Sequence, residues 1–194
     1  SQISQIFPTN GPNGWVLAST PQNEMFPESQ FSDNPLYGIN RAKLNWMVIQ
    51  PQFLNRGGGN PYSERIDIRE IFKNRQIQQN GVNVNLVRSL DIMYCPDERG
   101  PYNFDTPDGT AFSAGLTQDG RLDDPESRWG GIMRSITTND FQAANIEFVE
   151  FWMLDPFLDT LGSGNPRLDA TEGRMDGEMY LEFGNVSEDV LRDG

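Results

Sequence analysis

The most hydrophobic stretch of the sequence lies at residues 146–154, which read IEFVEFWML. Successive side chains of an extended strand point to opposite faces, and here both faces are mainly apolar. One face carries Glu150 and the other carries Glu147 among large hydrophobic residues. A strand that is apolar on both faces is usually covered on both sides. The stretch therefore predicts the central strand of a packed β-sandwich.

Other stretches of the chain also show the alternation of a strand. Residues 41–50 (RAKLNWMVIQ) predict a strand that Pro51 ends, because proline cannot donate to a sheet. Residues 82–94 alternate between apolar and polar side chains, and Arg88 falls on the apolar face, which predicts a bulge, a break or a buried ion pair. Residues 178–183 alternate cleanly, with their apolar side chains predicted to point inward.

The rest of the chain is rich in turn-forming residues, with 19 Gly and 13 Pro. Residues 1–35 predict an irregular extension whose aromatic residues, Trp15 and Phe26 among them, pack on the domain. Residues 96–122 predict a loop. Residues 36–194 predict an all-β domain with few short helices, a sandwich truncated at its C-terminal end within a helix that Ser187 caps.

The charge of the chain disfavours some classes of partner. Acidic residues number 28 against 15 basic ones, and the formal net charge is −13. A protein that binds nucleic acids or anionic membrane surfaces usually has a surplus of basic side chains, so the composition disfavours both kinds of partner. The sequence contains no histidine, which excludes a Ser-His-Asp triad and histidine-ligated zinc. Its single cysteine, Cys95, predicts a small buried side chain rather than a reactive thiol.

Carboxylate pairs are the remaining route to catalysis without histidine. Glu147 and Glu150 lie three residues apart, so on a strand they point to opposite faces. Glu178 and Glu182 share a face, but nothing places another carboxylate across a substrate from them. A charged Glu150 among apolar residues favours pairing with an arginine such as Arg134. These observations favour a protein that is not an enzyme.

Two acid-rich loops are the candidates for binding calcium, whose ligands are oxygens. Neither loop has the spacing of an EF-hand, and acidic loops are more often simply hydrated. The prediction is therefore that the chain needs no cofactor, with structural calcium as the alternative. The acidic residues of the loops are Asp119, Asp123, Asp124 and Glu126 in one, and Asp169, Glu172 and Asp176 in the other.

Tryptophans would offer stacking platforms for sugars if they were exposed. Trp46 and Trp152 sit in apolar strand candidates and are predicted to lie in the core. Trp129, next to two glycines, is the best surface candidate, and Tyr102 is a second aromatic residue in a turn-rich segment. Packing is nevertheless the more common fate of a tryptophan, because burial of its ring removes a large area from water.

Five strings of the sequence, in order along the chain, resemble the SprA/Sov family. They are YGINRAKL (37–44), DERGPYNF (97–104), RWGGIMR (128–134), NDFQAANIEF (139–148) and GNVSEDVL (184–191). Members of this family are very large outer-membrane proteins of Bacteroidetes that are needed for gliding motility and for the type IX secretion system. The resemblance covers most of the chain, from about residue 26 to residue 194.

The resemblance implies that the parent protein is the translocon, a giant β-barrel that passes folded cargo across the outer membrane. This chain would then be a soluble domain between barrel strands, at the outer membrane or cell surface. It would contact other parts of the translocon and secretion-system proteins, and secreted cargo is a further candidate partner. It would meet the membrane only through the barrel.

The family offers no catalytic residues, so the resemblance implies structural roles for the strings. Arg99 and Trp129, each followed by glycine, would set turns, and Asp140 would start the turn into the strand at 146–154. The end of the chain also resembles galactose-binding-like jelly rolls, a likeness of fold that does not imply sugar binding. Two alternatives remain: a carbohydrate-binding module with Trp129 and Tyr102 as stacking residues, and a hydrolase that depends on Glu150.

Overall fold

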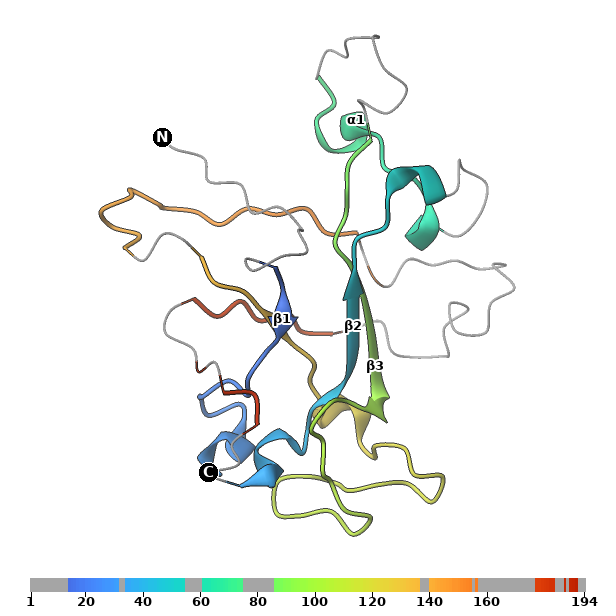
Figure 1. Ribbon diagram of the computed structural model, residues 1–194, viewed down its shortest axis with the longest axis vertical. Helices are drawn as coiled ribbons and strands as arrows, with labels where there is room; N and C mark the ends of the chain where they lie inside the picture. The colour runs from blue at the N-terminus through green and yellow to red at the C-terminus, as the bar shows by residue number, and fades with distance from the viewer. Residues whose placement is uncertain are drawn as a thin grey trace. The chain divides into compact units, whose positions relative to one another are not determined.

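The computed structural model describes residues 14–31, 34–54, 61–74, 86–136, 140–154, 156, 177–183, 187 and 189–191 (Figure 1). The longest elements among these residues are two strands, and every helix is short, so the chain is all-β in class, as predicted. Among these residues, no helix has the length and apolarity needed to span a bilayer.

The chain divides into two compact units, each built from separate stretches of sequence. Unit 1 consists of Ser1–Ile6, Val48–Leu90 and Thr138–Leu181. Unit 2 consists of Phe7–Met47, Asp91–Thr137 and Glu182–Gly194. Residues 14–31 thus belong to the same unit as the longest strands, and the expected domain boundary between residues 35 and 36 stays a prediction.

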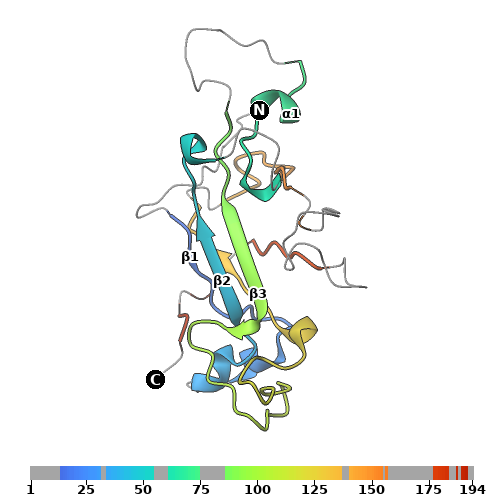
Figure 2. The same cartoon turned by 90° about the vertical axis from the view of Figure 1, so that its right-hand side faces the viewer.

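The longest strands of unit 2 are β2 (Ala42–Met47) and β3 (Asp91–Arg99), which form an antiparallel pair (Figure 2). Leu44 pairs with Tyr94 and Trp46 with Ile92, so these four side chains share one face of the sheet. β2 confirms the strand predicted at residues 41–50. The strand ends at Met47, before the chain reaches Pro51, so Pro51 is not what ends it.

β3 differs from the sequence prediction at both ends. It begins only at Asp91, after four residues outside any strand, which agrees with a break near Arg88. It then continues through Pro96 to Arg99, where the sequence predicted a loop. The register explains how a proline is tolerated: Lys43 pairs with Cys95 but Ala42 pairs with Arg99, so residues 96–98 bulge out of the ladder.

The remaining strands of unit 2 are β1 (Val16–Leu17) and β4 (Ile132–Met133), which pair antiparallel. The segment before β4 is hydrogen-bonded on both sides: Ala42 N donates to Trp129 O at 2.7 Å, and Ala18 N donates to Gly131 O at 3.0 Å. The prediction that these residues set a turn is therefore wrong. A Cβ on Gly130 would lie 2.9 Å from Leu44 Cβ, so glycine lets this segment approach β2 closely.

The turn after β3 follows the sequence prediction. Gly100 N donates to Arg41 O at 3.1 Å, and Asn103 N donates to Gly100 O at 3.3 Å. A Cβ on Gly100 would lie 2.3 Å from Ala42 O, so only glycine fits there. Three 3₁₀ helices flank this region: η1 (Pro27–Gln30), η2 (Pro35–Gly38) and η5 (Pro125–Ser127). Among the described residues, the buried hydrophobic ones are Phe26, Tyr37, Ile39, Ala42 and Leu122.

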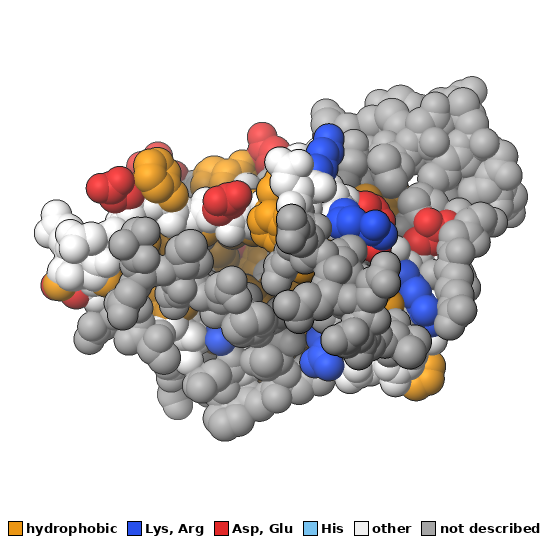
Figure 3. Space-filling model, turned by 90° about the horizontal axis from the view of Figure 1, so that it is seen from above, with side chains coloured by type: hydrophobic (Ala, Val, Ile, Leu, Met, Phe, Trp, Pro, Cys, Tyr) orange, Lys and Arg blue, Asp and Glu red, His pale blue; other side chains and the backbone are white. Residues whose placement is uncertain are grey.

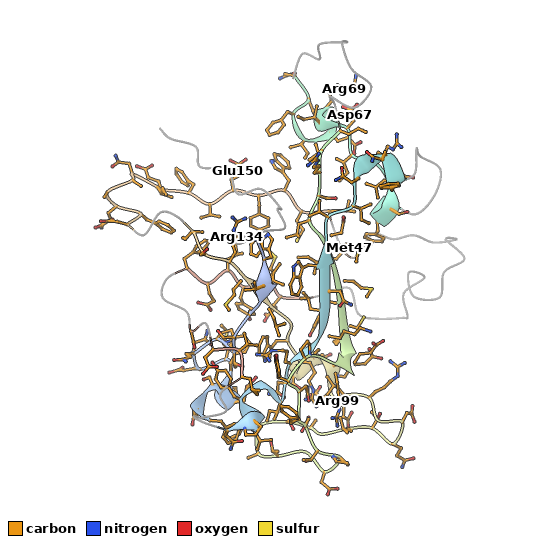
Figure 4. All side chains as sticks on the ribbon, in the orientation of Figure 1. Met47, Asp67, Arg69, Arg99, Arg134 and Glu150 are labelled. Carbon is orange, nitrogen blue, oxygen red and sulfur yellow. The ribbon has the colours of Figure 1, made fainter. Side chains whose placement is uncertain are left out.

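Unit 1 contains η3 (Pro51–Phe53), η4 (Pro61–Ser63) and α1 (Ile68–Ile71). The sequence is compatible with either a strand or a short helix at residues 66–72, and the structure shows a short helix there, α1. Its start is fixed by a capping box in which the Asp67 carboxylate accepts from the backbone, and Arg69 also pairs with Asp67 (Figure 4).

The structure contradicts the central strand predicted at residues 146–154. These residues run as an extended chain but belong to no strand (Figure 1). Phe148 is 83% exposed and Trp152 is 62% exposed, so the prediction of a core position for Trp152 is also wrong. An alternating pattern of side chains indicates an extended backbone, but it does not show whether another strand pairs with that backbone.

Residues 177–183 show the same difference. They form no strand, and the side chains predicted to point inward are about half exposed: Met179 53%, Leu181 52% and Phe183 47%. Farther along, Ser187 Oγ accepts from Asp189 N at 3.1 Å, which is the bond of a helix cap, but the described residues 189–191 form no helix.

Candidate functional site

The densest group of charged and polar side chains is buried in unit 2. We call it the buried polar cluster. Its members come from four parts of the chain: η1, the residues that precede β2, the turn after β3, and the end of η5. All are at most 6% exposed except Trp129, which is half-buried. They are Glu28, Asn40, Arg41, Asn103, Asp105, Arg128 and Trp129.

An ion pair with both side chains completely buried lies at the centre of the cluster. Arg128 Nη1 is 2.8 Å from Asp105 Oδ2, and neither side chain has any exposed area. The other N–H groups of Arg128 donate to backbone oxygens, among them Asp123 O at 2.9 Å and Gly115 O at 2.9 Å. Asp105 Oδ1 accepts from Ser113 Oγ at 2.5 Å. A buried ion pair is tolerated when its remaining hydrogen-bonding capacity is used in this way.

Arg41 joins distant parts of unit 2 through backbone oxygens. Its Nη1 donates to Pro101 O at 3.1 Å, and its Nη2 donates to Ala18 O at 3.2 Å and Val190 O at 3.3 Å. Its guanidinium carbon lies 5.1 Å from the centre of the Trp129 ring, a cation–π distance. Burial lowers the pKa of Arg41 to about 10, so the group stays charged at neutral pH.

Glu28 and Trp129 form the second polar contact of the cluster that involves an acid. Trp129 Nε1 donates to Glu28 Oε1 at 2.7 Å. Burial raises the pKa of Glu28, against the smaller opposing effects of this bond and of the nearby Asn40 and Arg41. The Trp129 ring also meets Phe26 edge-on, with 5.6 Å between ring centres. Both the N–H group and the ring of Trp129 are therefore used within the chain.

Asn103 ties the turn after β3 to the start of β2. Its Nδ2 donates to Ile39 O at 2.8 Å and to Arg41 O at 2.7 Å, while its Oδ1 accepts from Asp105 N at 2.9 Å. The amide thus satisfies backbone groups of two segments at once, which a hydrophobic side chain of similar size would leave unpaired. The neighbouring Tyr102 has a φ of +59° and is 45% exposed.

The residues that the sequence singled out come from different segments of the chain, and three of them, Arg99, Arg134 and Glu150, are labelled in Figure 4. Trp129 belongs to the buried polar cluster, and Arg99 borders it because Arg99 Nη2 donates to Asp105 O at 2.8 Å. Arg134 lies over the ring of Trp15, with 5.5 Å from its guanidinium carbon to the ring centre. Glu150 is an exposed residue of unit 1, whereas Arg134 belongs to unit 2, so the predicted pairing of the two stays a prediction.

Asp140 has the role expected of it. Its Oδ1 accepts from Ala143 N at 2.9 Å, and Ala144 N donates to Asp140 O at 3.2 Å, so Asp140 starts the turn that leads into residues 146–154. The turn ends at Asn145, whose φ of +50° suits asparagine.

Sequence reasoning missed most of the buried polar cluster. Arg41, Asn103 and Arg128 lie within strings that were recognised but interpreted as turns or strand ends. Arginine in an otherwise apolar or glycine-rich string was a usable signal, since such a cation needs a buried partner. Asp105 and Glu28 carried no local signal, because their partners lie 23 and 101 residues away along the chain.

The described acidic candidates are not arranged as a catalytic carboxylate pair or as a set of metal ligands. Glu147, Glu150 and Glu178 are exposed, and Glu182 accepts from Asn23 Nδ2 at 3.0 Å. No three acidic or thiol side chains of the described residues come together as metal ligands. Asp169, Glu172 and Asp176 lie outside the described residues. Cys95 is half-buried on β3.

The internal bonds of the buried polar cluster limit what it can do chemically. Its ion pair has no exposed area, its arginines donate mainly to backbone oxygens, and its acids accept from side chains of the same chain. A group that transfers protons or binds a ligand needs access to that ligand and capacity for a further bond. The arrangement therefore suits a junction that fixes several segments of the fold.

A comparison with models of known protein families finds no match, and no curated protein matches the chain.

Proposed function

We propose that the chain is a non-catalytic structural and interaction domain of the outer-membrane translocon of the type IX secretion system. In that role it supports protein secretion and gliding motility at the outer membrane or cell surface of a Gram-negative bacterium. The proposal rests on the five strings that resemble the SprA/Sov family. Its partners are other parts of the translocon and secretion-system proteins, and secreted cargo is a further candidate.

The observation that carries the proposal is where these strings meet. Arg41 belongs to the first string, Asn103 to the second, and Arg128 and Trp129 to the third, and all are members of the buried polar cluster. Val190 of the fifth string accepts a hydrogen bond from Arg41. The strings are thus used to join segments of the chain to one another, which supports a structural role over a catalytic one.

We further propose that unit 2 is built as a β-sandwich of the jelly-roll or galactose-binding-like type. The close approach of Gly130 to Leu44 supports this arrangement, as does the nearby Tyr94 ring, whose Cδ2 lies 3.0 Å from the position of a Gly130 Cβ. The segment that leads into β4 therefore packs against a face of the β2–β3 pair. A layer of chain across the inner face of a sheet is the basic feature of a sandwich.

Removal of residues 1–194 from the parent protein tests the proposed function. In a gliding bacterium that encodes the parent, an in-frame deletion of these residues should abolish the release of type IX cargo into the medium and the gliding of cells. Arg128→Ala should reduce both, because it breaks the buried ion pair. Arg121→Ala is the matched control, since Arg121 forms an ion pair in which both side chains are at least 41% exposed.

Normal secretion and gliding after the deletion would contradict the proposal, provided that immunoblotting shows the shortened parent protein in the outer membrane. Binding of the isolated chain to a glycan array, with loss of binding in Tyr102→Ala and Trp129→Ala, would instead support the carbohydrate-binding alternative. Tyr102→Ala is the more informative variant, because Tyr102 is 45% exposed while Trp129 also packs inside the chain.

A further inference from the structure

Residues 146–154 expose an unusual amount of hydrophobic side chain. Phe148 is 83% exposed, Trp152 62% and Met153 60%, and three more large apolar residues of the stretch are between 46% and 51% exposed. Single exposed hydrophobic residues are common on protein surfaces, but a contiguous run of this size marks a surface that another molecule covers.

This stretch is positioned at both of its ends within unit 1. At its start, Ile146 N donates to Phe141 O at 2.9 Å, which closes the turn that Asp140 begins. Near its end, the Trp152 ring meets Phe72 edge-on, with 6.2 Å between ring centres. Between these two points the chain is extended, and Phe148 lies where neither contact covers it.

The backbone of residues 147–154 is available for strand pairing. No backbone hydrogen bond or bridge joins it to another residue in the part of the chain that the structure describes. An extended backbone with open N–H and C=O groups, flanked by hydrophobic side chains, is a template to which a further strand can add. The main-chain bonds would give affinity, and the alternating side chains would give specificity.

The charges of the stretch indicate the chemistry of the added strand. Each face of residues 146–154 carries one exposed acid, Glu147 on one and Glu150 on the other. Hydrophobic side chains also lie next to acidic ones on the face shown in Figure 3. We propose that residues 146–154 dock an extended, hydrophobic segment of another protein that carries Lys or Arg opposite these two glutamates. This inference deepens the proposed interaction role and rests on it.

A second copy of the chain is a poorer occupant than a basic partner. Full antiparallel pairing of residues 146–154 with themselves places Glu150 opposite Glu150, and parallel pairing in register places both glutamates beside their own copies. Like charges directly opposite each other destabilise a pair of strands. The net charge of −13 on each chain adds a general repulsion between copies.

A designed peptide tests the proposal on the full chain. The peptide LMWFKVFKI is the reversed sequence of residues 146–154 with lysine in place of glutamate, so antiparallel pairing puts lysine opposite both Glu147 and Glu150. The matched control is LMWFEVFEI, and both carry the same polar solubilising tag. At low salt the lysine peptide should bind about tenfold more tightly, and the difference should shrink as salt screens the charges.

Variants of the chain separate strand pairing from hydrophobic adhesion. Val149→Pro removes a backbone donor and should abolish binding, and bound lysine peptide should slow amide exchange at residues 147–153 in the original chain. Phe148→Ala should weaken binding severalfold, while Phe53→Ala, which removes a side chain that is 76% exposed elsewhere in unit 1, should leave it unchanged. Glu150→Lys should reduce the preference for the lysine peptide.

Three outcomes would overturn the proposal: equal or tighter binding of the glutamate peptide, binding without amide protection at residues 147–153, or no binding of the lysine peptide at any salt concentration. Concentration-dependent dimerisation that Val149→Pro abolishes would identify a second copy as the occupant and would also overturn it. The deletion of residues 1–194 from the parent protein tests the proposed function independently of these binding experiments. The proposed function can therefore stand even if residues 146–154 bind no peptide.

Discussion

In unit 2 the charged side chains of Arg128 and Asp105 have no exposed area, whereas in unit 1 the hydrophobic side chain of Phe148 is 83% exposed. Polarity alone would predict the reverse in both places. Arg128 is buried because carbonyl and carboxylate oxygens surround its guanidinium group. Phe148 is exposed because no neighbouring strand covers its extended segment in the described chain.

The comparison shows that a side chain of this protein is buried where the fold provides bonding or packing partners for it, whatever its polarity. Unit 2 brings the partners together from distant parts of the sequence: a bond of Arg41 joins residues 149 positions apart, and the bond between Trp129 and Glu28 joins residues 101 positions apart. A buried network of this kind stabilises a single arrangement of the chain, because any other arrangement leaves charges without partners. Unit 1 instead has a hydrophobic, extended segment at residues 146–154 that pairs with no strand among the described residues.

The largest expected effect comes from breaking the buried ion pair. Arg128→Ala leaves Asp105 as a buried charge without its cation, and it should lower the free energy of unfolding by about 3–5 kcal/mol. Denaturation by urea, followed by tryptophan fluorescence, measures the change.

Arg121→Ala is the control for this variant, because the Arg121–Asp97 pair lies at the surface and its loss should cost about 0–1 kcal/mol. The double variant Arg128→Met with Asp105→Leu should recover part of the lost stability, since it removes both charges. Equal effects of Arg128→Ala and Arg121→Ala would mean that Arg128 is not buried in solution.

A smaller effect is expected where backbones approach closely in unit 2. Gly100→Ala places a Cβ 2.3 Å from Ala42 O, and because the clash is with backbone, the variant should lose about 1–3 kcal/mol of stability. Gly120→Ala is the control: its Cβ meets nothing within 4 Å, and only the φ of +79° opposes it. Gly120→Ala should therefore cost about 1 kcal/mol, and an equal cost for Gly100→Ala would rule out the close approach of the turn to β2.

The sequence predicted those features that depend on neighbouring residues. β2 follows from the alternation of its side chains, although it ends at Met47 rather than at Pro51. The turns at Gly100 and Asp140 follow from residue types with strong turn preferences. Each of these needs information from fewer than ten residues, which the sequence displays directly.

Features that depend on distant partners escaped prediction. Glu28 sits in a segment that the sequence predicts to be an irregular extension, and only the fold brings it to Trp129. Trp129, Gly130 and Gly131 looked like a turn, but hydrogen bonds from Ala42 and Ala18 hold them extended. The alternation of residues 146–154 predicted an extended backbone, yet alternation contains no information about whether a second strand lies beside it.

Tyr94 gives a test of the packing over β3 that depends on pH. Its hydroxyl donates to Arg128 O at 2.6 Å, and burial raises the pKa of Tyr94 to about 12, against a smaller lowering by the Arg128 charge. Because the pKa is higher in the folded chain than the usual 10, its contribution to stability is complete below pH 10 and is lost as pH rises towards 12.

Tyr94 should therefore ionise near pH 12 in the folded chain, as measured by ultraviolet absorbance of tyrosinate. Tyr94→Phe should remove that step and should cost about 1 kcal/mol at neutral pH for the lost hydrogen bond. Tyr102→Phe is the control, because it removes a hydroxyl from a ring of similar exposure, 45% against 42% for Tyr94, and leaves the bond from Tyr94 to Arg128 O in place. A step that survives Tyr94→Phe would assign it to another residue.

The smallest expected effect sharpens the comparison most directly, because it uses the same residue type in both units. Phe148→Ser should change the free energy of unfolding by about 0.5 kcal/mol or less, since its side chain is 83% exposed. Phe26→Ser should cost about 3 kcal/mol, because Phe26 is only 9% exposed and packs against Trp129. Equal losses would mean that residues 146–154 are covered within the chain in solution, as the sequence alone predicted. A loss at Phe26 alone leaves the surface of residues 146–154 open for a partner.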